Sequence, residues 1–324
     1  MALLTPLSLE EARRLGARYG LNVTAVRGIP QGSVNSNFAL ELAGGERAFA
    51  RIYEEQTAAT AAGEARLLEH LVTCGVPSAR PLPRRDAPGE LIAEHAGKPV
   101  AVFSWASGEM LCQARVTPDA AYQVGEALGR VHAAGESFPD ASRSRFDVTK
   151  LEERLAGLRA RELPPEIAAL LPRLEARLAR FAGRDGGASP FAGLIHGDLF
   201  RDNVLWEGHR ITALLDFESA ARESRPFDLM VTILAWCFGD ELDPALVRAL
   251  ARGYTRARPL PADEAESLYS EGCFAALRFT ITRITDFELR PKGSGVYKDY
   301  RRFLARGDAL EALGPGGLRA LIGA

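Results

Sequence analysis

The pattern of apolar and polar positions along the chain changes character near residue 105. Before this point, short runs of alternating apolar and polar residues are separated by turn residues, a pattern that predicts β-strands. Beyond it, apolar residues recur at every third or fourth position almost to the end of the chain, which predicts helices. We therefore expect an α+β protein with a small lobe over residues 1–103, a hinge at 104–108 and a larger, mainly helical lobe over 109–324.

The N-terminal lobe is predicted to contain a five-stranded antiparallel sheet and an inserted helix. Before the sheet, residues 8–20 predict an amphipathic helix, with Ser8 as N-cap and Glu11 completing a capping box. Gly44-Gly45 is typical of a hairpin turn between two of the strands. The predicted strands are NVTAVRGI, SNFALEL, RAFARIY and two segments near 90–95 and 99–105, and the predicted inserted helix covers 57–73.

The helical part of the chain contains one interruption. Helical periodicity is found over residues 118–135, 147–182, 226–238, 243–257 and 262–288. Between them lies the segment 194–220, in which NVLW and ITALLDF predict a short hairpin around Glu207-Gly208. Because loops carried by a rigid scaffold often bear functional residues, we expect the chemistry in this segment.

Composition and charge limit the partners of the chain. It has 324 residues, 47% of them apolar and 25% charged, which is the composition of a globular protein with a sizeable core. With 40 basic and 42 acidic residues the net charge is −2, which argues against nucleic acid or an anionic membrane as a partner. The chain has no apolar run of membrane-spanning length and no evident signal peptide, so we expect a cytoplasmic protein. The cysteines lack metal-site spacing and are expected to be four buried thiols, at Cys74, Cys112, Cys237 and Cys273.

Three polar residues within the interruption have the chemistry of a phosphotransfer site. Asp198 and Asn203 lie five residues apart on one predicted loop, and Asp216 ends an apolar strand. Carboxylate and amide oxygens suit Mg²⁺, so Asn203 and Asp216 are candidate metal ligands. Asp198 is then the candidate catalytic carboxylate, which orients the attacking hydroxyl and takes its proton. The alternative, in which Asp198 begins a helix and Asp216 merely ends a strand, explains each residue alone but not their joint spacing.

A second group of candidates lies upstream and would bind the nucleotide. Residues 28–37 join the first two predicted strands and contain Gly32, Ser33 and Asn35, small and polar residues that allow the backbone to approach a triphosphate. An ordinary hairpin turn is the alternative for such a segment. Ser104 begins the predicted hinge, where we expect ATP to bind between the lobes.

Arg51 and Glu64 are predicted to form an ion pair. Arg51 lies in the third predicted strand, where a protein kinase carries the lysine of its V-A-I-K motif. Glu64 shares a face of the following helix with Leu67, Leu68 and Leu71, and a carboxylate on an apolar face needs a partner. Together they would present a cation to the α- and β-phosphates. The alternative is an exposed strand arginine.

Three segments resemble the aminoglycoside phosphotransferase and choline kinase superfamily, which has the bilobal protein-kinase-like fold. They are HGDLFRDNVLW, ITALLDFESA and PFDLMVTIL. The resemblance implies that His196 and Asp228 support the catalytic loop, that ATP and Mg²⁺ are bound, and that a small hydroxyl compound is the acceptor. Within the superfamily the chain is most similar to the bacterial homoserine kinases of this fold, through GIPQGSVNSNFAL, the AWC at 235–237 and ALRFTITRITDF. This similarity implies L-homoserine as the acceptor and a place in threonine biosynthesis.

The acceptor site has several candidate residues. Arg283 and Asp286, three residues apart in a late helix, would bind the carboxylate and ammonium groups of an amino acid, or else form a surface ion pair. Glu218 follows Asp216 and is expected to border the acceptor pocket. Leu234-Ala235 stand where the resemblance leads us to expect Asn-Asp.

Other functions are compatible with part of the pattern. Choline, ethanolamine or an aminoglycoside is the alternative acceptor, and Trp105, Trp206 and Trp236 would then cage a cationic ligand instead of packing in the core. An inactive kinase-like binding protein is the alternative of a different class, supported only by arginine in place of the usual lysine. A protein kinase is disfavoured because neither the glycine of D-F-G nor an A-P-E segment follows Asp216.

Overall fold

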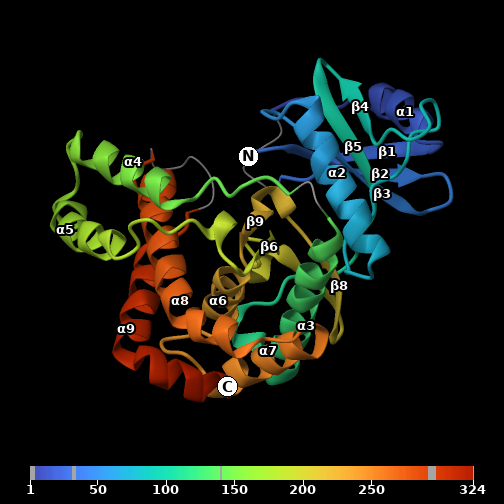
Figure 1. Ribbon diagram of the computed structural model, residues 1–324. Coiled ribbons are helices and arrows are strands. Elements are labelled where there is room, and N and C mark those ends of the chain that lie inside the picture. Colours follow the sequence, from blue (N-terminus) through green and yellow to red (C-terminus); the bar gives the residue numbers. More distant parts are fainter. Residues whose placement is uncertain (1–3, 31–33, 139–140, 291–296, 324) are drawn as a thin grey trace. The chain divides into compact units, whose positions relative to one another are not determined.

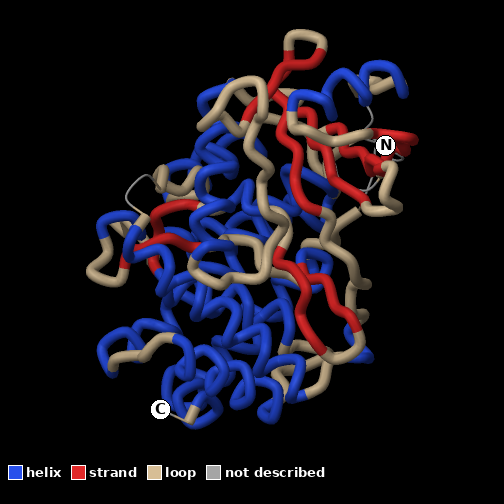
Figure 2. Tube along the Cα trace, turned by 90° about the vertical axis from the view of Figure 1, so that its right-hand side faces the viewer, coloured by secondary structure: helices blue, strands red, loops and turns tan. Residues whose placement is uncertain are grey.

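The computed structural model describes residues 4–30, 34–138, 141–290 and 297–323. The chain divides into two compact units. Unit 1 comprises Met1–Gly108 and Thr212–Glu218, and unit 2 comprises Glu109–Ile211 and Ser219–Ala324. The segment that contains Asp216 thus groups with the N-terminal residues. Figure 1 labels the main elements, and Figure 2 distinguishes helices from strands.

Unit 1 is built on a five-stranded antiparallel sheet. Its strand order is β1-β2-β3-β5-β4, with β1 at Val23–Gly28, β2 at Ser36–Leu42, β3 at Arg47–Ile52, β4 at Ile92–His95 and β5 at Lys98–Ser104. Helix α1 (Leu9–Arg18) begins at the capping box of Ser8 and Glu11, and helix α2 (Ala58–Thr73) begins after the N-cap Thr57. The predicted strands and both predicted helices of this part are confirmed.

The alternation of side chains along β3 decides where Arg51 points. Ala48, Ala50 and Ile52 are buried in a core that they share with residues of α1. Because successive side chains of a strand point to opposite faces, Arg51 and Phe49 lie on the other face of the sheet. Glu64 of α2 meets Arg51 on that face.

Unit 2 is mainly helical. Its helices are α3 (Pro118–Ala134), α4 (Val148–Arg159), α5 (Pro165–Ala179), α6 (Arg225–Trp236), α7 (Pro244–Ala257), α8 (Ala262–Arg283) and α9 (Arg301–Ile322). A π-helical turn, Ile284–Glu288, continues α8. Strands β6 (Ala192–Ile195) and β9 (Ala221–Ser224) pair antiparallel. The segment 204–214, which passes from unit 2 into unit 1, forms the predicted hairpin of β7 (Val204–Glu207) and β8 (Arg210–Leu214). Short 3-10 turns are at Gln113–Arg115, Gly135–Ser137, Gly186–Ala188, Arg201–Asn203 and Phe217–Ser219.

Helices α3 and α7 pack backbone against backbone. A Cβ on Gly125 of α3 would lie 2.0 Å from the carbonyl oxygen of Leu250, and a Cβ on Gly253 of α7 would lie 1.9 Å from that of Tyr122. Real side chains cannot approach a backbone so closely, so this contact requires glycine at both positions. The pair forms a rigid base for the side chains near its ends.

The structure differs from the sequence prediction in several places. The helical periodicity predicted over 147–182 corresponds to two helices, since α4 ends at Arg159 and Pro164 and Pro165 begin α5. The prediction of four buried thiols is wrong for Cys74 and Cys112, which are exposed. The β6–β9 pair was not predicted, and neither were the limits of α9. A search of the described helices finds none that is long and apolar enough to cross a membrane.

Candidate active site

A buried carboxylate of unit 2 fixes the loop that follows β6. Asp228, on α6, is fully buried and accepts hydrogen bonds from the backbone N–H groups of His196 (2.7 Å) and Gly197 (2.8 Å). Gly197 has a φ of +78°, and a Cβ there would lie 2.7 Å from the carbonyl oxygen of Ser219, so this turn requires glycine. Asp198 therefore follows two residues whose backbone is held in place.

Two residues that the sequence did not single out hold Asp228 in turn. The Nε2 atom of His132 lies 3.0 Å from the Asp228 carboxylate, and its Nδ1 atom lies 2.8 Å from the hydroxyl oxygen of Tyr254. Since a carboxylate only accepts, Nε2–H donates to Asp228 and Nδ1 accepts from Tyr254. Burial disfavours the charged form of Asp228 and by itself would raise its pKa. The hydrogen bond from His132 and the interactions with His196 outweigh burial and hold the pKa of Asp228 below its ordinary value. No spacing in the sequence connects His132 with Asp228, so only the fold reveals this network.

Asn203 is oriented by Asp198. Its Nδ2 atom donates to the Asp198 carbonyl oxygen at 2.7 Å and lies 3.4 Å from the Asp198 carboxylate. The amide nitrogen is thus directed at Asp198, which leaves Oδ1 as the atom that can bind a cation. Asn203 is buried and Asp198 is half-buried, so both lie at the edge of the unit 2 core.

Asp216 lies in unit 1, is separated from the end of β8 by Leu215, and has an unusual backbone. Its φ is +61°, and among the described residues other than glycine only Ala96 also has a positive φ. Such a conformation costs about 1–3 kcal/mol and occurs most often at functional sites. The carboxylate is exposed.

The donor atoms of Asn203 and Asp216 fit a hard divalent cation. Both offer oxygen, which Mg²⁺ prefers, and Mg²⁺ usually takes one or two protein ligands and completes its shell with water and phosphate oxygens. Throughout the ranges that the structure describes, no group of three or more His, Cys, Asp or Glu side chains gathers to form a closed metal site. Asn203 belongs to unit 2 and Asp216 to unit 1.

The predicted Arg51–Glu64 ion pair is confirmed, and it belongs to a larger cluster. The Nη1 atom of Arg51 lies 3.1 Å from Glu64 and 3.5 Å from Glu218. Asn35 donates to the same Glu218 oxygen at 2.5 Å. Burial raises the pKa of Glu64, and the charge of Asp216 adds to this, while Arg51 opposes both. One guanidinium therefore contacts two carboxylates, those of Glu64 and Glu218.

Of the remaining residues predicted to bind the nucleotide, the structure describes only some. Gly32 and Ser33 lie outside the described residues. Ser104 ends β5, and its hydroxyl accepts a hydrogen bond from the backbone N–H of Arg80 at 2.9 Å. Glu218, expected to border the acceptor pocket, contacts Asn35 and Arg51, which are residues predicted for the nucleotide.

Arg283 and Asp286 do not pair with each other as a surface ion pair. Asp286 pairs with Arg154 at 2.5 Å. Arg283 is only 8% exposed, and its guanidinium donates to the carbonyl oxygen of Asp299 at 2.9 Å. Arg278, one and a half turns earlier on α8, is also buried.

Two of the three tryptophans are core residues. Trp236 is fully buried, its indole N–H donates to the carbonyl oxygen of Leu199 at 2.9 Å, and its ring packs 6.2 Å from that of Trp206. Trp105 belongs to unit 1, where Arg47 stacks on its ring. The core interpretation therefore holds for Trp206 and Trp236.

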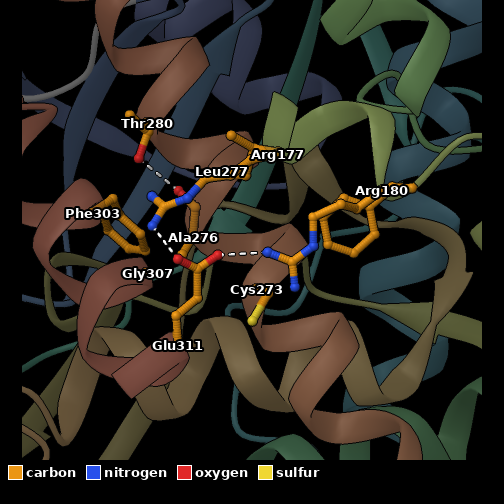
Figure 3. Close-up of a pocket in the computed structure, with 10 residues that line it drawn as sticks. Arg177, Arg180, Cys273, Ala276, Leu277, Thr280, Phe303, Gly307 and Glu311 are labelled. Carbon is orange, nitrogen blue, oxygen red and sulfur yellow. Dashed lines mark hydrogen bonds and ion pairs between the residues drawn. The ribbon is translucent and has the colours of Figure 1, made fainter. Parts of the chain in front are cut away.

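A pocket between α5, α8 and α9 has charged walls but little room (Figure 3). Its volume is about 10 Å³, enough for roughly one water molecule. Glu311 of α9 pairs with both arginines of its wall, Arg177 and Arg180. Since Arg177 also pairs with Asp308, neither guanidinium is left without a carboxylate that a charged ligand could replace.

Comparison with known proteins gives the family. The model of the phosphotransferase enzyme family matches residues 25–260. A homoserine kinase from Brucella anthropi is 34% identical over 306 residues, which cover 92% of this chain and 90% of the relative. Another, from Cupriavidus necator, is 34% identical over 311 residues and covers 89% of both chains.

Solved structures show the same fold at lower identity. An aminoglycoside phosphotransferase from Alicyclobacillus acidocaldarius superposes with a TM-score of 0.68 at 17% identity, over 100% of this chain and 98% of the other. The amicoumacin kinase hAmiN, solved with AMP-PNP, Ca²⁺ and its ligand, also gives a TM-score of 0.68, at 15% identity over 94% and 95% of the two chains. The fold is therefore the protein-kinase-like one. From the family match and the identity to its relatives, this chain belongs to the phosphotransferase enzyme family and is an ATP-dependent phosphotransferase with a hydroxyl group as acceptor.

Proposed function

We propose that this enzyme transfers the γ-phosphate of ATP to the side-chain hydroxyl of L-homoserine. The observation that carries the proposal is the similarity to homoserine kinases, which extends over about nine-tenths of both chains. Homoserine phosphorylation would place the enzyme in threonine biosynthesis, in the cytoplasm.

The residues of unit 2 account for the acceptor half of the reaction. Asp198 orients the acceptor hydroxyl and takes its proton as the oxygen attacks the γ-phosphorus and ADP leaves. His196 and Asp228 keep the loop in the conformation that presents Asp198, and the hydrogen bonds from His196 and Gly197 to Asp228 support this role.

The residues of unit 1 account for the nucleotide half. Arg51 binds the α- and β-phosphates, and Glu64 orients it, as their ion pair suggests. Gly32, Ser33, Asn35 and Ser104 are proposed as further nucleotide contacts. Asn203 and Asp216 would hold Mg²⁺, which when bound neutralises the phosphate oxygens.

A panel of acceptors tests the proposal. ADP release is measured with L-homoserine, choline, ethanolamine and kanamycin, with Asp198→Asn as the blank, and the product is identified by ³¹P NMR. We expect ADP release and a phosphomonoester with L-homoserine. Turnover of choline or kanamycin in preference to L-homoserine would contradict the proposed acceptor. Tight ATP binding without turnover of any acceptor would favour the inactive binding protein.

A further inference from the structure

Helix α8 of unit 2 buries two guanidinium groups for which the described residues provide no carboxylate partner. Arg278 is 4% exposed and Arg283 is 8% exposed. Within the described part of the chain, no carboxylate lies within ion-pair distance of either one. By contrast, the buried Arg258 pairs with Glu264 at 2.9 Å, and the half-buried Arg184 pairs with Glu271 at 2.6 Å. Because an unpaired buried charge is costly, an unpaired guanidinium requires a separate explanation.

Arg306 is a third buried arginine without a carboxylate partner in the described residues, and backbone carbonyl groups accept its hydrogen bonds. Arg278 and Arg283 have fewer such bonds. Arg306 donates to the carbonyl oxygens of Leu234 (2.7 Å) and Arg302 (2.8 Å). Arg283 has one such bond, to Asp299, and its Nε atom is buried without a partner. The Nε atom of Arg278 is also buried without one, and this guanidinium is held by stacking. Its in-plane N–H groups are therefore the donors that a ligand would use.

The two guanidinium groups stack on the rings that pack against the Asp198 loop. Arg278 lies 3.8 Å from the ring centre of Phe279, and Arg283 lies 4.5 Å from that of Phe303. The ring of Phe200 packs on both, at 5.1 Å and 5.7 Å. The backbone N–H of Phe200 donates to the carbonyl oxygen of Asp198 at 2.7 Å. One aromatic cluster therefore links both arginines to the catalytic loop.

We infer that Arg278 and Arg283 bind the carboxylate of the acceptor, so that the enzyme selects hydroxy acids over amino alcohols. This inference rests on the proposed function and names the groups that would give it its specificity. Guanidinium is the side chain best suited to a carboxylate, because its planar fork can donate two parallel hydrogen bonds.

Electrostatics agrees with this assignment. Burial lowers the pKa of Arg278 and of Arg283 to about 10 each, and the charge of Asp198 is the largest effect that opposes burial at both. Other arginines, including Arg154 and Arg302, add to the positive potential. A second anion beside these groups is therefore favourable, whereas a cationic acceptor without a carboxylate is repelled.

The size of the acceptor makes the location reasonable. In L-homoserine three carbon atoms separate the hydroxyl oxygen from the carboxylate carbon, a span on the order of 5 Å. When the hydroxyl is at Asp198, the carboxylate must therefore bind within the same part of unit 2. Asp286 is already paired with Arg154, whereas Arg278 and Arg283 have no carboxylate partner among the described residues, so these arginines suit the carboxylate of the acceptor better than Asp286 suits its ammonium group.

Three acceptors separate the contributions of the two charged groups. L-Homoserine has both, 4-hydroxybutyrate keeps only the carboxylate, and 3-aminopropan-1-ol keeps only the ammonium. The ratio kcat/KM is measured for each with the wild type, Arg278→Met and Arg283→Met. Arg180→Met is the matched control, since Arg180 is a half-exposed arginine of the same unit that pairs with Glu311.

We expect each α8 variant to lose about 100- to 1000-fold in kcat/KM with L-homoserine, the range for removing one partner of a buried charge pair. The loss should appear mainly in KM, and the value for 3-aminopropan-1-ol should change by less than threefold. Thermal stabilisation by 4-hydroxybutyrate without nucleotide should be seen in the wild type and Arg180→Met but be lost in Arg278→Met. Because methionine removes an unpaired charge, Arg278→Met should melt no lower than the wild type.

The outcomes distinguish this inference from the proposed function. If the wild type phosphorylates L-homoserine but the α8 variants lose equal activity with all three acceptors, or keep the preference for carboxylates, the inference is wrong and the proposed function stands. If the wild type ignores both carboxylate acceptors and phosphorylates choline, the proposed function is wrong and the inference falls with it.

Discussion

Unit 2 contains two groups of arginines that differ in one respect. In the pocket of Figure 3, Arg177 and Arg180 reach Glu311, and Arg177 also reaches Asp308 at 2.6 Å. On α8, Arg278 and Arg283 stack on aromatic rings and have no such partner in the described residues. The first group is complete without a ligand, whereas the second has donors left over. We therefore expect substitutions in the first group to change stability and substitutions in the second to change acceptor binding.

The largest effect is expected from Asp198, the carboxylate whose charge acts most strongly on the two α8 arginines. Asp198→Asn should lower kcat by about 10²–10⁴-fold, because it removes the group that takes the proton. It also removes a negative charge beside Arg278 and Arg283, so the affinity for 4-hydroxybutyrate should stay the same or increase. Calorimetry and steady-state kinetics on one preparation measure both. A loss of affinity as large as the loss of kcat would show that Asp198 binds the acceptor and is not its base.

Substitutions of Arg51 and Glu64 test whether an arginine that already has a carboxylate partner can also contribute to catalysis. Arg51→Ala and Glu64→Ala should each lower kcat/KM by about 10- to 100-fold, and the double variant should lose little more, because residues in contact couple strongly. Arg51→Lys should keep part of the activity with an altered KM for ATP. Arg47→Ala is the control on the same strand, since Arg47 is exposed and stacks on Trp105. Strictly additive losses would mean that the ion pair does not act as a unit in catalysis.

A substitution in the pocket of Figure 3 should change the stability of the protein but not its activity. Glu311→Gln leaves Arg177 with Asp308 and should lower the free energy of unfolding by about 1–2 kcal/mol, since Arg177 is mostly buried. Its kcat/KM should equal that of the wild type. Glu266→Gln, which breaks an exposed pair with Arg319, is the control and should cost at most about 0.5 kcal/mol. A change in KM for L-homoserine in Glu311→Gln would remove the distinction between the two groups.

The smallest expected effect concerns the His132–Asp228 pair. Burial lowers the pKa of His132, so the folded protein keeps this histidine neutral, while the unfolded chain takes up a proton below about pH 6.5. Stability should therefore fall as the pH falls, by about 1 kcal/mol between pH 7.0 and 5.5. Urea unfolding of the wild type and of His132→Gln at both pH values measures this, and the variant should lose less. An equal loss in both would assign the acid sensitivity to other groups.

Local and periodic features could be predicted from the sequence. Ser8 and Glu11 form their capping box because the interaction spans only three residues. The Arg51–Glu64 pair was predicted from the place of Arg51 in the third strand, where a protein kinase carries its V-A-I-K lysine, and from an apolar helix face that left one carboxylate in need of a partner. The role of Asp228 came from resemblance to a family, not from its spacing.

What the sequence could not show depends on contacts between distant segments. His132 gave no signal because Asp228 and Tyr254 are about 100 residues away or more along the chain. Arg283 and Asp286 suggested an ion pair by spacing, but Arg154 of α4 takes the carboxylate instead. The sequence is equally silent on Arg278, which has no carboxylate partner within the described ranges, because the absence of a partner is a property of the fold.

The glycine contact between α3 and α7 makes the activity of the enzyme sensitive to substitutions at positions that take no part in the reaction. Any larger residue at Gly125 or Gly253 must push the helices apart, and these helices carry His132 and Tyr254. Asp228 would then lose its support, and the loop before Asp198 would lose its anchor. In a genetic screen for loss of activity, inactivating alleles should therefore accumulate at these two glycines, even though neither one contacts ATP or the acceptor.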